Sequence, residues 1–269
     1  MFYIGTMIRS VGQTSYVNSP NFMAYADRQA PIDQSAAGSG MSVLALYLMT
    51  QGISLASEGV SKALMRGKEY TTAQNVKKVV NDMIKDGKLD GINVSFLNPN
   101  NVDTFSRSSG IPIQQLMDVA NGKNAFYMDS KNIAVAPTTK PSLIQHELGH
   151  AINAKKPFWK ALQNSRRYLP MIPALLLGAD MLLKRANKSN EPTVIEKNAG
   201  LLGFAAYMPT IVEEAAASIR GIQAAKKTLG GNVKLGALRK NYFLAWLTYL
   251  LAGIGFGAAT KISVKTGIL

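Results

Sequence analysis

The two histidines of this chain lie four positions apart in the stretch PSLIQHELGH, at His146 and His150, and they are the only two in its 269 residues. On an α-helix, side chains at positions i and i+4 share one face, with Cβ atoms about 5 to 6 Å apart. Two imidazoles at that separation can bind one metal ion, with Zn–N distances of about 2.0 to 2.1 Å. The pair therefore predicts a metal site, with one Zn²⁺ per chain as the expected occupant.

Glu147 follows the first histidine directly and adds a candidate catalytic group. One residue further along a helix turns the side chain by about 100°, which lets this carboxylate reach a water molecule beside the metal ion. A carboxylate there accepts a proton from water as a general base. The H-E-x-x-H pattern is typical of a zinc hydrolase, and Glu147 is its expected base.

The residues around the histidines indicate that they lie on a helix. Pro141 and Ser142 suit a first helical turn. The apolar residues that follow repeat at helical spacing: Leu143, Ile144, Leu148, Ala151 and Ile152. Gly149 costs about 1 kcal/mol relative to alanine inside a helix. Its presence predicts that another element passes close over this position.

A catalytic zinc ion of this type needs a third protein ligand. The chain has no cysteine and no further histidine, and Lys156 stands six positions after His150, where a metzincin would have its third histidine. The ligand must then be acidic. The acidic residues after His150 are Asp180, Glu191, Glu196, Glu213 and Glu214.

Glu213 and Glu214 are the best placed of these five acidic residues. They are expected to open an alanine-rich helix, EEAAASIRGIQAAKK, immediately after an apolar segment. Glu191 and Glu196 fall in a polar stretch, and Asp180 is alone inside an apolar run. The third ligand is therefore expected from the adjacent pair.

The composition favours a membrane-associated protein. The chain has 30 Lys and Arg residues against 16 Asp and Glu, a formal net charge of +14, and 47% hydrophobic residues. Such a basic chain generally meets an anionic partner, either nucleic acid or a membrane surface. The apolar content favours the lipid bilayer, and no helix-turn-helix, zinc-finger or aromatic RNA-binding motif supports nucleic acid.

Changes in composition divide the chain into parts. Residues 1–40 predict a flexible segment, and residues 41–66 an apolar to amphipathic helix associated with the membrane. The peptidase core is expected from residues 67–167 and 213–240, and an apolar helical hairpin from residues 168–212. Residues 242–260 approach the roughly 20 residues that cross a bilayer, so they predict a transmembrane helix.

Within the core, the pattern predicts both helices and strands. Thr72 to Asp86 is an amphipathic helical stretch, Ile92 to Leu97 a strand, and Ile113 to Asn121 a short helix. The stretches AFYMD and NIAVA alternate around Ser130 and Lys131 like a hairpin. We expect an α+β fold that is mainly helical, with a small β-sheet.

HELGH followed by a glutamate on a later helix resembles the gluzincin pattern, and NAFYMDSKNIAVAP is similar to the strands before the zinc helix in the HtpX and CAAX prenyl-protease family of membrane metallopeptidases. The resemblance covers roughly residues 91–220 and implies a gluzincin catalytic core with Glu214 as the third ligand. In that family an aspartate four residues after this ligand orients a zinc histidine, and Ser218 stands there in this chain. Either Asp180 replaces that aspartate, or the weaker hydroxyl is tolerated.

An extended peptide substrate could add to an exposed edge strand through backbone hydrogen bonds. The candidate edge consists of Asn124, Ala125, Phe126 and Tyr127. The alternative is an ordinary buried strand.

Oxyanion stabilisation needs a donor besides the metal, and Arg220 and Tyr207 are the candidates. Arg220 lies six positions after Glu214, about 120° away around a helix, so the two do not obviously share a face.

These features together predict an integral membrane, zinc-dependent endopeptidase that cleaves peptide or protein substrates. Two alternatives are a catalytically silent membrane scaffold that retains a metallopeptidase fold, and a basic membrane-surface protein whose motif is accidental.

More positive residues precede residues 242–260 than follow them, which predicts a cytoplasmic active site. They are Lys226, Lys227, Lys234, Arg239 and Lys240 on one side, and Lys261 and Lys265 on the other. The hairpin at 168–212 has basic residues at both ends and is short, so it is expected to dip into the membrane or to pack against the protein rather than cross twice. The family resemblance would allow a full crossing.

Overall fold

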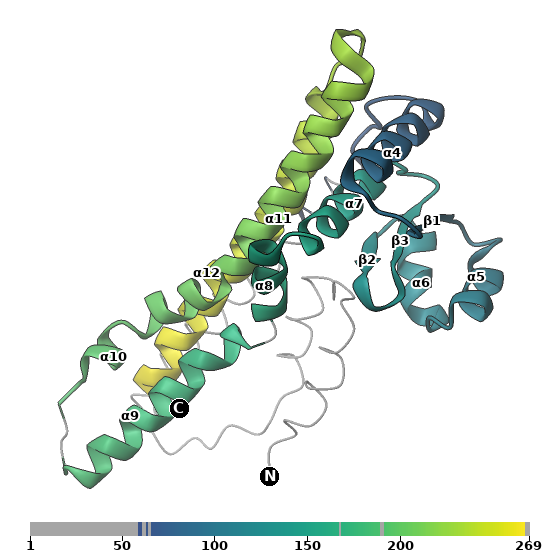
Figure 1. Cartoon of the computed structure of the whole chain (residues 1–269). Coiled ribbons are helices and arrows are strands. Elements are labelled where there is room, and N and C mark those ends of the chain that lie inside the picture. Colours follow the sequence, from purple (N-terminus) through teal and green to yellow (C-terminus); the bar gives the residue numbers. More distant parts are fainter. Residues whose placement is uncertain (1–58, 61–62, 64–65, 167, 189–190, 267–269) are drawn as a thin grey trace. The chain divides into compact units, whose positions relative to one another are not determined.

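The computed structural model describes residues 59–60, 63, 66–166, 168–188 and 191–266, so residues 1–40 and most of 41–66 lie outside the described part of the chain. The described residues are mostly helical and contain a three-stranded sheet (Figure 1). One compact unit holds the described residues between Lys62 and Lys160 together with Glu213–Trp246. The other holds the described parts of Ala161–Val212 and Leu247–Leu269. The expectation of a mainly helical chain with a small sheet is confirmed.

The sheet of the first unit has the order β1-β3-β2. Strand β1 (Asn93–Leu97) pairs in parallel with β3 (Ile133–Pro137), and β2 (Phe126–Met128) pairs antiparallel with β3. A single 3-10 turn, η1 (Asp129–Lys131), and Asn132 at φ 51° join β2 to β3, which confirms the predicted hairpin. Strand β2 is an edge strand that begins at Phe126, so the expected edge at 124–127 is two residues too long at its start.

Helices α4 (Ala73–Gly87), α5 (Val102–Ser109), α6 (Ile113–Ala120) and α7 (Leu143–Ala154) belong to the same unit. The Thr72 side chain begins α4 by accepting a hydrogen bond from the backbone N–H of Asn75. Helices α4 and α6 and strand β1 match the predicted elements. Helix α5 was not predicted, because its sequence VDTFSRSS has few apolar residues.

Strand β3 separates two apolar cores because successive side chains point to opposite faces of a strand. Ala134 and Ala136 contribute to a core that contains apolar residues of α4 and α7. Ile133 and Val135 contribute to a second core that contains apolar residues of α5, α6 and β2. The sheet is thus covered on both faces, and α7 is held directly against it.

Helix α11 (Ala199–Leu229) is continuous, which corrects the expectation that a helix opens at Glu213. The apolar stretch before Glu213 is helical as well, and Pro209 lies inside the helix. A proline removes a single backbone donor and clashes with one preceding carbonyl, and here the helix continues on both sides of it. Glu213 is therefore a mid-helix residue. The turn η3 (Gly230–Asn232) leads on to α12 (Gly236–Thr266).

The second unit contains α9 (Ile172–Ala186), α10 (Val194–Lys197) and parts of α11 and α12. It also contains η2 (Leu169–Met171) and the end of α8 (Pro157–Ser165). The segment 168–212 is accordingly helical over most of its length. Among the described residues, one helix is long and apolar enough to cross a membrane, over Gly236–Val264 of α12, and the predicted span at 242–260 lies within it.

Candidate metal centre

Helix α7 carries the HELGH motif, as the sequence predicts, and it begins at Leu143 directly after Ser142. The helix is enclosed in the first unit: Glu147 is 4% exposed and His150 is 1% exposed. The hydroxyl of Tyr242, on α12, donates a hydrogen bond to the Ser142 carbonyl at 2.8 Å. The first turn of α7 is therefore fixed by a side chain that lies a hundred residues later in the chain.

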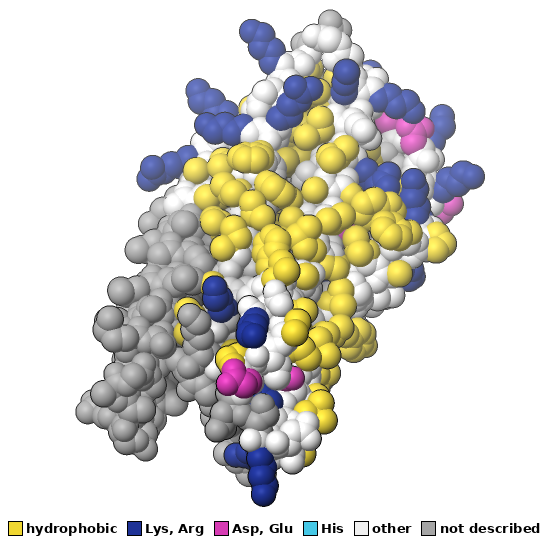
Figure 2. Space-filling model, turned by 90° about the vertical axis from the view of Figure 1, so that its left-hand side faces the viewer, with side chains coloured by type: hydrophobic (Ala, Val, Ile, Leu, Met, Phe, Trp, Pro, Cys, Tyr) yellow, Lys and Arg dark blue, Asp and Glu magenta, His cyan; other side chains and the backbone are white. Residues whose placement is uncertain are grey.

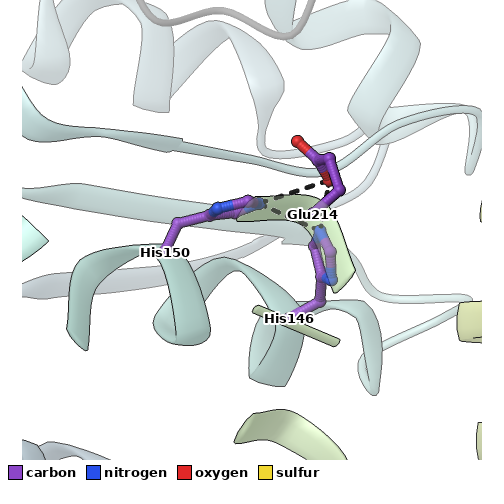
Figure 3. A group of neighbouring side chains, drawn as sticks. All are labelled: His146, His150 and Glu214. Atoms are coloured by element: carbon purple, nitrogen blue, oxygen red, sulfur yellow. Dashed lines mark hydrogen bonds and ion pairs between the residues drawn. The ribbon is translucent and has the colours of Figure 1, made fainter. Parts of the chain in front are cut away.

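His146, His150 and Glu214 bring one donor atom each to a common point (Figure 3). The Nε2 atoms of the two histidines are 3.0 Å apart. Glu214 Oε2 lies 3.1 Å from His146 Nε2 and 3.6 Å from His150 Nε2. The ligand atoms of a tetrahedral zinc site are about 3.3 Å apart at normal Zn–N distances. These three residues can hold a metal ion, because their spacing matches one face of such a tetrahedron.

Glu147 is buried beside this donor triangle, and its Oε2 has no hydrogen-bond partner among the described residues. Burial raises the pKa of the Glu147 carboxyl and outweighs the opposite effect of the two nearby histidines. A buried polar oxygen without a partner is uncommon and calls for an explanation. A water molecule or metal ion at the triangle would supply one.

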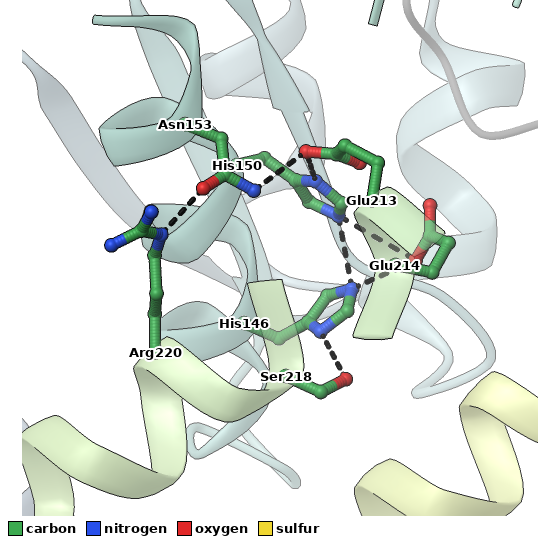
Figure 4. Close-up of polar contacts among 7 residues, drawn as sticks. All are labelled: His146, His150, Asn153, Glu213, Glu214, Ser218 and Arg220. Carbon is green, nitrogen blue, oxygen red and sulfur yellow. Dashed lines mark hydrogen bonds and ion pairs between the residues drawn. The ribbon is translucent and has the colours of Figure 1, made fainter. Parts of the chain in front are cut away.

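The other ring nitrogens of the histidines also have partners (Figure 4). His150 Nδ1 lies 2.9 Å from Glu213 Oε1, and His146 Nδ1 lies 3.0 Å from Ser218 Oγ. A carboxylate only accepts hydrogen bonds, so Nδ1 of His150 carries the proton and donates to Glu213. Once Nε2 has lost its own proton, its lone pair points into the triangle, as metal coordination requires.

Glu213 also accepts a hydrogen bond from Asn153 Nδ2 at 2.9 Å, and Arg220 Nε donates to Asn153 Oδ1. Arg220 is thus on the Nδ1 side of His150, behind the ring as seen from the donor triangle (Figure 4). The contacts of its guanidinium group are to the residues that hold the histidine. The prediction of Arg220 as an oxyanion donor gains no support from this placement.

Gly149 confirms the prediction that another element passes close over the motif. A Cβ atom at this position would lie 2.8 Å from Ala217 Cα, which belongs to α11. Real side chains do not tolerate that separation, so only glycine permits the observed approach of the two helices. The same approach carries Glu213, Glu214 and Ser218 to the histidines.

Two of the predicted site residues lie in the second unit. Asp180 is on α9, where its Oδ2 accepts a hydrogen bond from Thr193 Oγ1 at 2.5 Å. Tyr207 is on α11, with its ring 6.4 Å from that of Phe256.

The hydrogen-bond partner of His146 Nδ1 in the structure is Ser218. Phe126 and Tyr127 lie in the edge strand β2, and Asn124 and Ala125 precede it.

The sequence reasoning missed three residues near the histidines. Asn153 lies three positions after His150 on α7, a spacing that could have identified it. Glu213 was considered only as an alternative ligand. Tyr242 packs its ring 5.6 Å from that of His146, and no local pattern in the sequence indicates this contact.

No protein-family model, curated protein or solved structure matches the chain.

Proposed function

We propose that this chain is a membrane-associated, zinc-dependent endopeptidase with His146, His150 and Glu214 as metal ligands and Glu147 as general base. One observation carries the proposal. The three donor atoms are spaced like the corners of one face of a zinc tetrahedron, and beside them lies Glu147, whose buried Oε2 has no hydrogen-bond partner among the described residues. The resemblance of HELGH and of residues 124–137 to the HtpX and CAAX prenyl-protease family agrees with this proposal.

Zinc bound by these ligands would act as a Lewis acid toward a peptide carbonyl and would lower the pKa of water. The protein residues supply the remaining chemistry. Glu147 accepts the proton of the attacking water, and its raised pKa makes this carboxylate a stronger base than an exposed glutamate. The same carboxyl group then returns the proton to the amine that leaves.

The edge strand β2 is the proposed docking site for the peptide. It pairs with β3 on one side, so its other edge can accept an extended chain through backbone hydrogen bonds. The register of β2 is fixed by the pairs Phe126–Val135 and Met128–Ile133. All three side chains of β2 are buried, so the backbone of this strand, rather than its side chains, would recognise the substrate.

A position in the membrane is supported by two helices. Helix α12 has the length and composition of a span over Gly236–Val264. Helix α9 directs leucines outward: Leu175, Leu182 and Leu183 are 67%, 64% and 62% exposed. Its Asp180 is 7% exposed and hydrogen-bonded, and Lys184 forms an ion pair with Glu196 at 2.9 Å. A buried, hydrogen-bonded aspartate, a paired lysine and outward leucines suit a hydrocarbon environment.

The surface of the described residues agrees with this placement. Hydrophobic side chains gather on one face, and Lys and Arg side chains lie beside them (Figure 2). Lys and Arg residues near a membrane favour its anionic cytoplasmic side. We therefore propose that the active site faces the cytoplasm.

Cleavage by a Glu147→Gln variant tests the enzyme proposal. The full chain is purified in detergent, loaded with zinc and incubated with an unstructured protein substrate. The variant should bind zinc as the wild type does, but cleave at least about 10²-fold more slowly. A Glu214→Gln variant prepared in parallel controls for contaminating proteases, because it should lose both the metal and the activity.

A catalytically silent membrane scaffold is the second candidate. Ser218, a neutral hydroxyl where the resemblance implies a carboxylate, is the observation that favours it. A wild-type protein that binds one zinc ion and cleaves no substrate would support the scaffold. Cleavage that depends on Glu147 would exclude it.

A further inference from the structure

Four side chains form a continuous polar array behind the metal centre: His150, Glu213, Asn153 and Arg220 (Figure 4). They come alternately from two helices. His150 and Asn153 are three residues apart on α7, and Glu213 and Arg220 are seven residues apart on α11. Both spacings place the two side chains on one face of their helix. The array therefore follows one part of the contact between α7 and α11, beside Gly149.

Glu213 is a buried charge that needs compensation. Its exposure is 0%, and an ionised carboxylate without partners is costly in such a place. Its Oε1 accepts from both His150 Nδ1 and Asn153 Nδ2, at 2.9 Å each. The positive charge of Arg220 acts on Glu213 as well. The carboxylate is thus held by Asn153 and Arg220 as well as by the histidine.

Asn153 has a defined orientation because Arg220 can only donate hydrogen bonds. The amide oxygen of Asn153 must face Arg220, and its NH₂ group must then face Glu213. If Arg220 were replaced by an apolar residue, the amide could turn over and present its oxygen to the Glu213 carboxylate. The contact would become repulsive, and the acceptor of His150 would be displaced.

We propose that Arg220 is a positioning residue for the metal centre. Acting through Asn153 and Glu213, it fixes the ring of His150 with its proton on Nδ1 and its Nε2 toward the ion. The inference rests on the proposed metal ligands but not on peptidase activity. Among the described residues, the partner of His146 at the corresponding nitrogen is the neutral hydroxyl of Ser218, whereas His150 faces a carboxylate that Asn153 and Arg220 support.

Metal titration of the purified full chain in detergent tests this role. Co²⁺ and Zn²⁺ are titrated into metal-free protein, and both affinity and the visible spectrum of Co²⁺ are recorded. Loss of a residue that orients a metal ligand typically lowers affinity by about 10- to 100-fold. We expect such a loss for Glu213→Gln and a smaller loss for Arg220→Met, each with an altered Co²⁺ spectrum. Arg220→Lys, which keeps a donor, should recover part of the affinity.

A double variant separates positioning from simple helix packing. If Arg220 acts through Glu213, then Arg220→Met added to Glu213→Gln should cost no further affinity, because residues of one network are not additive. Thermal unfolding of the metal-free variants reports packing separately. Arg107→Met is the matched control, since Arg107 is an exposed arginine of α5 in the same unit. It should change neither affinity nor spectrum.

Three results would overturn the inference. Wild-type affinity and spectrum in Arg220→Met would show that Arg220 does not act on the site. Additive losses in the double variant would show that it acts by another route. If Arg220→Met does not fold, Arg220→Lys becomes the test. A metal affinity of Arg220→Lys as low as that of Glu213→Gln would then count against the role. A wild-type protein that binds no metal would refute the proposed metal centre itself. That result can be told apart from the three above, in all of which the wild type binds metal.

Discussion

Glu213 and Glu214 are adjacent in the sequence, and they face the two different ring nitrogens of His150. Glu213 Oε1 lies 2.9 Å from Nδ1, and Glu214 Oε2 lies 3.6 Å from Nε2. Neighbouring residues on a helix differ by about 100° in direction, and the imidazole of His150 fits between the two carboxylates. One carboxylate can thus bind the ion while the other orients the ring that binds it.

This division predicts different outcomes for two similar substitutions. Glu214→Gln removes a metal ligand, and purified protein should lose its zinc at equilibrium with a weak chelator. Glu213→Gln removes only the acceptor of His150, and zinc should remain, with affinity about 10- to 100-fold lower. Elemental analysis after dialysis measures both. Loss of zinc from Glu213→Gln alone would reverse the assignment of ligand and partner.

The affinity for metal should rise with pH. Burial lowers the pKa of His150, but the carboxylates of Glu213 and Glu214 outweigh it and raise this pKa to about 10 in the metal-free protein. A pKa raised from 6.5 stabilises the metal-free fold fully below pH 6.5, and this contribution disappears as the pH rises through about 10. Metal binding must displace the proton throughout that window.

Calorimetry in buffers of different ionisation enthalpy measures this proton. We expect a proton from His150 to be released on zinc binding at pH 8, and fewer protons to be released by Glu213→Gln, whose histidine loses a negative neighbour. Equal proton release by both proteins would show that Glu213 does not control the histidine.

Gly149→Ala should disturb the centre through packing alone. The added methyl group would lie 2.8 Å from Ala217 Cα, so α11 must move away from α7. Overpacking of this kind costs about 1 to 3 kcal/mol, and the metal affinity should fall because Glu214 moves with α11. Gly178→Ala in α9 is the control, since among the described residues no atom outside its own helical backbone and chain neighbours lies within 4 Å of a Cβ there. That control should keep its affinity, and its unfolding temperature should not fall, because alanine is favoured over glycine inside a helix by about 1 kcal/mol.

The proposed topology predicts which positions a membrane-impermeant thiol reagent reaches in intact cells. The chain has no cysteine, so single substitutions report without background. Leu269→Cys should be labelled, whereas Gly231→Cys and Lys188→Cys should be protected. Labelling of Gly231→Cys and not of Leu269→Cys would reverse the orientation. Labelling of Lys188→Cys together with Leu269→Cys would show that the segment 168–212 crosses the membrane.

The sequence was most informative where the relevant spacing is local. The distance of four residues between His146 and His150 determines their relative position on a helix, and Gly149 indicates a close neighbour. The strand pair around η1 follows from alternation and from turn residues. The acidic pair after the motif could be found by elimination, because so few acidic residues follow His150.

The remaining features depend on how α11 is rotated against α7. That rotation decides whether Glu213 or Glu214 faces Nε2, and it brings Ser218 to His146 and Arg220 to Asn153. Periodicity gives the directions of side chains around one helix, but not the angle between two helices. Glu213 was expected at a helix start because it directly follows an apolar segment that was taken to end at Val212, but α11 continues from that segment through Glu213.

The outward leucines of α9 determine how the protein must be handled. Leu175 and Leu182 expose about two thirds of their surface, whereas Asp180 and Lys184 of this helix are already paired. When detergent is diluted away, such a surface associates with copies of itself. The chain should then sediment as large aggregates in plain buffer and stay dispersed in lipid nanodiscs. Paired Leu175→Lys and Leu182→Lys substitutions should delay the aggregation without altering metal content.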